Sequence, residues 1–156
     1  MDSEDLLRPT LSDTERVPEL YGSTGFFLSA FFGGPAGAVI YGGFNSHRLN
    51  RLKKDVPLLL LIFIGAYLLP YALYQQGWLQ QLAAMAGGRA TRNYELILRV
   101  LGLLSFGAIY LMHRHFFRAA RIVGSDGLSG WRPGIAAVLL GIWANATFVQ
   151  WLLKHH

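Results

Sequence analysis

The sequence predicts an all-α integral membrane protein, a bundle of about four transmembrane helices joined by short connections. Charged residues make up only 15 % of the chain, against roughly 25 % in an average globular protein. Hydrophobic residues make up 53 % and aromatic residues 13 %, which excludes intrinsic disorder. The few charges also gather in clusters, so they do not coat a soluble globule. The length of 156 residues corresponds to one domain.

Four segments are predicted to cross the bilayer. A spanning helix needs about 20 predominantly apolar residues, and three long stretches contain no Lys, Arg, Asp or Glu. A fourth stretch is apolar except for two charged residues in its first turns. The chain before the first span is acidic, unlike the start of a secretory signal peptide, and is assigned as a tail. The tail covers residues 1–20, and the spans are about 21–44, 56–74, 94–112 and 133–153 within a membrane domain over 21–156.

The two charged residues in the third span are Glu95 and Arg99. Their i,i+4 spacing lets them pair on one helix face near the lipid headgroups. The long Arg99 side chain can also extend toward the membrane interface. We therefore predict an interfacial ion pair at this position.

The distribution of Lys and Arg predicts the orientation, because cytoplasmic connections of membrane proteins are enriched in both. With the intramembrane Arg99 left out, eight lie in the first and third connections and five in the remaining polar segments. Connections one and three are therefore predicted to be cytoplasmic, facing lipid phosphates, and both termini periplasmic. The eight are Arg48, Arg51, Lys53, Lys54, Arg114, Arg118, Arg121 and Arg132, and the five are Arg8, Arg16, Arg89, Arg92 and Lys154.

Small residues recur in the first span with a spacing of four, which places them on one face of a helix. Such a ladder lets a neighbouring helix approach closely, and this packing drives association within the bilayer. Two interpretations remain open: the ladder packs against another helix of the same chain, or it forms a homo-oligomer interface. The ladder consists of Gly25, Ser29, Gly33 and Gly37.

The first span also contains Gly34 and Pro35 near its middle. Proline removes a backbone hydrogen bond and clashes with the preceding turn, so a kink or break is predicted here. Broken helices form substrate and ion sites in transporters, but they also occur where neighbouring helices satisfy the freed carbonyls. In the last span, Gly141 and Asn145 share one face, which predicts an interhelical hydrogen bond at a close crossing.

Several classes of site are not indicated by the sequence. The chain has no Cys, which excludes thiol catalysis and thiolate metal sites. It has no Walker loop and no G-x-S-x-G motif, so we expect no cofactor and no catalytic residues. No metal site is expected, because the histidines lack nearby acidic ligands. Nucleic-acid binding is not expected either, because the basic groups lie where the membrane orientation places them.

Four short elements carry a resemblance. They are Leu20-Tyr21 at the start of the first span, the run Phe32-Gly33-Gly34-Pro35-Ala36-Gly37, Asn45 with Arg48 and Leu49 in the following basic loop, and Gly130-Trp131-Arg132 before the last span. In these elements the chain resembles a group of small bacterial inner-membrane proteins with a glycine- and proline-rich first transmembrane helix. The resemblance implies a multi-span helical protein of the bacterial inner membrane. It transfers no catalytic or ligand residues.

Two functional hypotheses follow. The first is a non-enzymatic protein that acts through helix packing, as an accessory or assembly subunit or an immunity-type binder. Its partners would be the lipid bilayer and another membrane protein or further copies of itself. The alternative is a small oligomeric channel or transporter, with a site at the Gly33-Gly34-Pro35 break and Asn145 opposite. A membrane enzyme ranks third, because no catalytic constellation is present.

Overall fold

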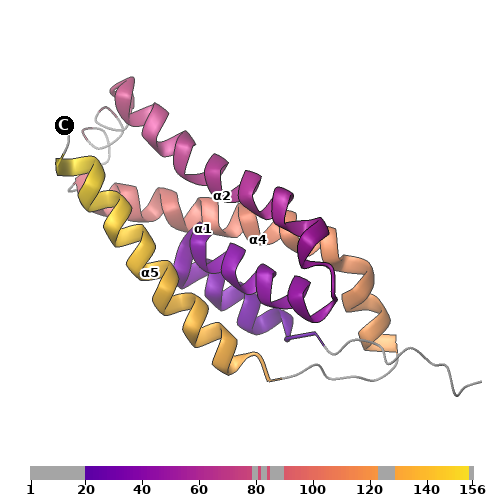
Figure 1. Cartoon of the computed structure of the whole chain (residues 1–156). Coiled ribbons are helices and arrows are strands. Elements are labelled where there is room, and N and C mark those ends of the chain that lie inside the picture. The colour runs from indigo at the N-terminus through magenta and orange to yellow at the C-terminus, as the bar shows by residue number, and fades with distance from the viewer. Residues whose placement is uncertain (1–19, 79–80, 82–83, 85–89, 123–128, 155–156) are drawn as a thin grey trace, which may run out of the picture.

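A computed structural model describes residues 20–78, 81, 84, 90–122 and 129–154. The predicted N-terminal tail therefore lies outside the described residues, apart from Leu20. Within the described residues four long helices pack as a bundle (Figure 1). All four are long and apolar enough to cross a membrane, so the predicted all-α membrane bundle is confirmed. The helices are α1 (Ser23–Arg48), α2 (Leu52–Gln75), α4 (Ala90–Ile122) and α5 (Trp131–Lys154).

The outer surface of the bundle is apolar, as contact with lipid requires. Large aliphatic side chains on α2 are more than half exposed, including Leu61 at 66 % and Leu68 at 58 %. Leu104 on α4 and Trp143 on α5 are exposed to a similar extent. Soluble monomers rarely expose contiguous apolar surface on this scale. The exposed faces of α2, α4 and α5 are therefore the surfaces that meet the hydrocarbon.

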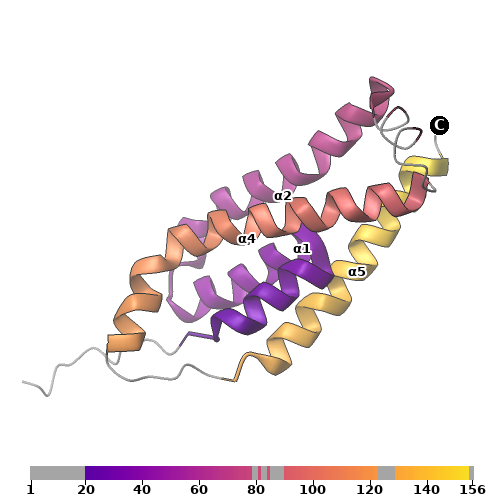
Figure 2. The same cartoon turned by 180° about the vertical axis from the view of Figure 1, so that it is seen from behind.

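Helix α1 is folded back on itself at Gly34, where the backbone leaves the helical conformation with φ 60° and ψ −153°. A straight helix of this length would separate its ends by about 39 Å. Instead, the backbone N–H of Tyr21 donates to Asn45 Oδ1 at 3.0 Å, and the Tyr41 hydroxyl donates to the Gly22 carbonyl at 2.9 Å. Figures 1 and 2 both show the two halves side by side. We call them the first half (23–33) and the return half (35–48).

The folded-back α1 is a re-entrant hairpin at the centre of the bundle. Half of its apolar window is buried, against 17–28 % for the other three helices. The first half packs on α5, where Gly33 lies against Ala137. The return half packs on α2 and α4, where Gly42 meets Leu59 and Ile109. The other three helices thus pack against the hairpin from several sides.

The hairpin corrects the predicted arrangement of the N-terminal side. Sequence analysis placed the tail and the first connection on opposite sides of the bilayer. In the structure the two ends of α1 lie at the same end of the bundle, beside the start of α5. The uncharged segment 21–44 is long enough for one crossing, and length alone does not reveal that Gly34 reverses its direction.

The shared end of the hairpin can be tested by cysteine labelling, because the natural chain has no Cys. Gly22→Cys and Lys53→Cys are expected to react with a membrane-impermeant maleimide from the same side of sealed vesicles. Gln76→Cys, at the C-terminal end of α2, is expected to react only from the other side. A straight α1 would instead group Gly22→Cys with Gln76→Cys.

Candidate functional site at the re-entrant hairpin

The hairpin turn is built from the two residues that the sequence marks as a break. Gly34 has a positive φ of 60°, a region that side-chain-bearing residues avoid. A Cβ at this position would lie 2.5 Å from Asn145 Nδ2. Pro35 follows and has no N–H to leave unsatisfied at the start of the return half. The turn meets α5 near its middle, at Gly141 and Asn145, so it lies at about mid-depth of the bundle.

Two side chains from other helices close the turn, and we call this pair the apex clasp (Tyr67 and Asn145). Asn145 Nδ2 donates to the Gly33 carbonyl at 3.0 Å, and the Tyr67 hydroxyl donates to Asn145 Oδ1. The last carbonyl of the first half is therefore satisfied by a side chain from another helix, as burial in a bilayer demands.

The predicted small-residue ladder is divided by the turn and packs inside the chain. Gly25, Ser29 and Gly33 lie on the first half, and Gly37 lies on the return half against the Ser29 carbonyl. Gly141 of α5 faces Gly33 so closely that a Cβ would meet its backbone. Ser29 itself donates to the Gly25 carbonyl at 2.7 Å. Ser29, Gly33 and Gly37 are buried within the chain, whereas Gly25 is only partly buried and lines the apolar groove described below.

A groove lies beside the turn, between the N-terminal part of α4 and the C-terminal part of α5. Its lining is mainly apolar but carries four polar or charged side chains, so we call it the polar groove. Its volume is about 410 Å³. The predicted pair Glu95 and Arg99 lines it, but within the described residues no contact under 4.0 Å joins their charged groups. The Arg99 guanidinium lies instead 5.9 Å from the centre of the Phe31 ring. The lining residues are Phe32, Glu95, Leu98, Arg99, Ile142, Asn145, Ala146, Val149 and Gln150.

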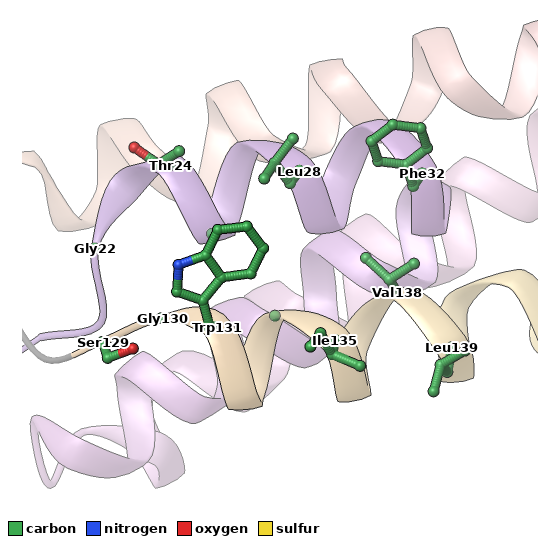
Figure 3. Close-up of a pocket in the computed structure, with 12 residues that line it drawn as sticks. Gly22, Thr24, Leu28, Phe32, Ser129, Gly130, Trp131, Ile135, Val138 and Leu139 are labelled. Carbon is green, nitrogen blue, oxygen red and sulfur yellow. The ribbon is translucent and has the colours of Figure 1, made fainter.

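An apolar groove of about 550 Å³ follows the outer side of the hairpin, between its first half and α5. Figure 3 shows Leu28 and Phe32 on one side and Ile135 and Leu139 on the other, with the Trp131 ring between the two helices. Phe32 borders both this groove and the polar groove. It therefore lies between the two grooves at the depth of the turn.

A buried polar cluster lies at the open end of the hairpin, and we call it the Asp–His site (Ser46, Asp55 and His113). His113 Nε2 is 3.1 Å from Asp55 Oδ2 and 3.3 Å from Ser46 Oγ. Asp55 also lies 3.8 Å from the Nε of Arg51. The cluster joins α1, α2 and α4, and all three of its side chains are buried.

Most of the predicted lipid-facing basic residues lie exposed at this same end of the bundle. Arg48 covers the Tyr21 ring at 4.7 Å, and the half-buried Arg51 lies 5.2 Å from the Phe116 ring. The side chain of Arg121 lies outside the described residues. The exposed set is Arg48, Lys53, Lys54, Arg114, Arg118 and Arg132.

Sequence reasoning missed Tyr67, Ser46 and Asp55. Asp55 carried one usable signal, because it is the lone acid in a basic connection and stands four residues after Arg51. Its partner His113 is 58 residues away, and no spacing rule joins them. Tyr67 is 78 residues from Asn145, and nothing in its local sequence distinguishes it from the other aromatic residues of an apolar span.

No family model, no curated protein and no solved structure matches the chain. Within the part of the chain that the structure describes, no three His, Cys, Asp or Glu side chains come together as metal ligands would. The features that bear on function are therefore the hairpin, the two grooves and the Asp–His site.

The turn conformation predicts opposite effects for two glycine substitutions. Gly34→Ala is expected to destabilise the protein by about 1–3 kcal/mol, because its φ is positive and its Cβ would press on Asn145. Gly43→Ala is the matched control: it is helical, nothing lies within 4 Å of its Cβ position, and the gain is about 0.5–1 kcal/mol. Unfolding titrations in detergent measure both. Equal effects would contradict the assigned turn.

Proposed function

We propose that the chain is a small transporter or channel subunit in which the re-entrant hairpin controls the passage of a polar solute or ion. One observation carries the proposal: the helix break lies at mid-depth, and Asn145 belongs both to its clasp and to the polar groove. Irregular backbone at this depth is tolerated where protein buries it or where it lines a cavity. In secondary transporters, such broken helices form the substrate site.

The hydrogen bonds of the clasp suggest how a solute would act. The polar groove leads from the C-terminal end of α5 to Asn145, and beyond it the closely packed hairpin closes the path. A solute that bonds the Asn145 amide competes with the Gly33 carbonyl or with Tyr67 for the same groups. Binding therefore weakens the clasp, and the turn is the part that moves.

The groove indicates the class of solute. Glu95 supplies a carboxylate and Arg99 a guanidinium, while Asn145 and Gln150 supply amides. A groove with both charges favours a zwitterionic or strongly dipolar molecule over a simple anion or cation. A volume of about 410 Å³ suits a small solute of amino-acid size.

The proposed location is the bacterial inner membrane, with the open end of the hairpin in the cytoplasm. The basic residues gather at that end, as cytoplasmic segments require. The chain then crosses the bilayer three times, through α2, α4 and α5. This places the N-terminal side in the cytoplasm and the C-terminus in the periplasm.

Transport is tested with purified protein in proteoliposomes and a panel of zwitterionic amino acids, alkali cations and chloride. Tyr67→Phe removes one clasp hydrogen bond of about 1 kcal/mol, so it is expected to change the flux roughly fivefold. Asn145→Leu removes both clasp hydrogen bonds and is expected to change the flux more strongly. Arg99→Gln should raise the substrate concentration needed for half-maximal flux. Lys154→Gln, at the same end but outside the groove, should leave the flux unchanged. Absence of flux for the whole panel would overturn the proposal.

A second candidate is a non-enzymatic accessory or assembly subunit, and the apolar groove of Figure 3 favours it. Small residues at Gly22, Gly25, Gly130 and Gly134 border the groove, which opens toward the bilayer. Small residues let a transmembrane helix of another protein, or of a second copy, approach the backbone. The groove would then be the contact surface in place of the buried part of the ladder.

Bulky substitutions on α5 test this second candidate. Ile135→Trp fills the groove and is expected to abolish co-purification of a partner, or self-association, in mild detergent. Leu140→Trp is the matched control, because Leu140 is similarly exposed on α5 but does not line the groove. Loss of association in both variants, or in neither, would exclude the groove as the interface.

A further inference from the structure

The Asp–His site lies where three helices meet, far from the polar groove. Ser46 is in the last turns of α1, Asp55 in the first turn of α2 and His113 in the C-terminal part of α4. Asp55 is 4 % exposed and His113 1 % exposed. Ionisable residues buried in a membrane protein are rare, and they mark proton or ion pathways by default.

The two ring nitrogens of His113 have different environments. Nε2 faces Asp55 and Ser46, whereas Nδ1 is buried without a hydrogen-bond partner. An ionised carboxylate accepts and does not donate, so Nε2 carries the hydrogen that binds Asp55. In the neutral ring, Nδ1 then carries no hydrogen and accepts no hydrogen bond from the protein.

A further proton therefore has one place to bind on the ring. The proton comes from hydronium in the surrounding water. An O–H bond of hydronium breaks, an N–H bond forms at Nδ1, and a water molecule is left. The product is an imidazolium whose new N–H is buried without an acceptor, which is unfavourable. The charged and titratable groups that act on the ring are Asp55, which contacts Nε2, Arg51, which lies beside Asp55, and the exposed His115 two residues along α4. The protonated ring is fully satisfied only when Nδ1 reaches water.

We propose that Asp55 and His113 form a proton-binding site whose protonation releases the return half of α1 from α2 and α4. The inference rests on the proposed function, because it makes the proton the ion that drives the hairpin. Ser46 links the site directly to the return half. Its neighbour Asn45 holds the backbone of Tyr21 at 3.0 Å, so movement there also loosens the start of the first half.

The release is measured by hydrogen–deuterium exchange of full-length protein in nanodiscs, at about pH 8 and about pH 5, the range over which histidine titrates. After correction for the intrinsic pH dependence, peptides covering 35–48 should exchange severalfold faster at the lower pH. His113→Gln should remove this response, because glutamine keeps a donor for Asp55 and does not titrate. His115→Gln is the matched control, since His115 is exposed, and should keep the response.

If His113→Gln fails to fold, Asp55→Asn replaces it as the test variant. Asp55→Asn is expected to alter the pH dependence of exchange in peptides covering 35–48. Nitrogen-15 spectra of the histidines should show the His113 ring neutral at the higher pH, with its hydrogen on Nε2. A response that survives in His113→Gln, or a wild-type hairpin whose exchange does not depend on pH, would overturn the proposal. The exchange measurement uses no solute. A failure of transport with an intact pH response therefore counts against the proposed function alone.

Discussion

The hydrogen bonds at the hairpin turn are the constraint on which the rest of the structure depends. A buried backbone group without a partner costs several kcal/mol in a hydrocarbon environment, and a helix break exposes such groups on both sides. Asn145 satisfies the Gly33 carbonyl at 3.0 Å, and the Tyr67 hydroxyl donates to Asn145 and holds its amide in place. Without these two side chains, a straight helix would satisfy the backbone better than the hairpin does. The hydrogen bonds of the clasp therefore stabilise the path in which the first hydrophobic segment turns back over the path in which it crosses the bilayer.

The return of α1 in turn produces the grooves. The hairpin lies between α4 and α5, so these helices make few direct contacts with each other. Beyond the turn the polar groove lies between them, and Phe32 is the residue of α1 that lines it. The apolar groove follows the side where only the first half covers α5. Phe32 lines both grooves. A movement of the turn that shifts its ring would therefore change the shape of both.

Much of the fold could be predicted, because charge-free stretches and proline chemistry are local properties of the sequence. They identified the four apolar helices, the break at Gly34 and Pro35, and Asn145 as a polar residue at a close crossing. The direction of the chain after the break is not a local property. It depends on Tyr67, 78 residues from Asn145, and on the packing of Gly37 against Ser29. The Asp–His site could not be predicted for the same reason, since its three residues come from three different helices.

The charge distribution supports the hairpin independently of any contact. With a straight first span, the two sides carry eight and five basic residues, a weak bias for an orientation rule that depends on short flanking segments. On a re-entrant path, the segment that precedes Leu20 in the sequence is counted with the first connection, and it contains Arg8 and Arg16. The counts become ten and three, the three being Arg89, Arg92 and Lys154. A sequence selected for membrane insertion is expected to show the sharper bias, so the distribution of Lys and Arg fits the re-entrant path better than the straight one.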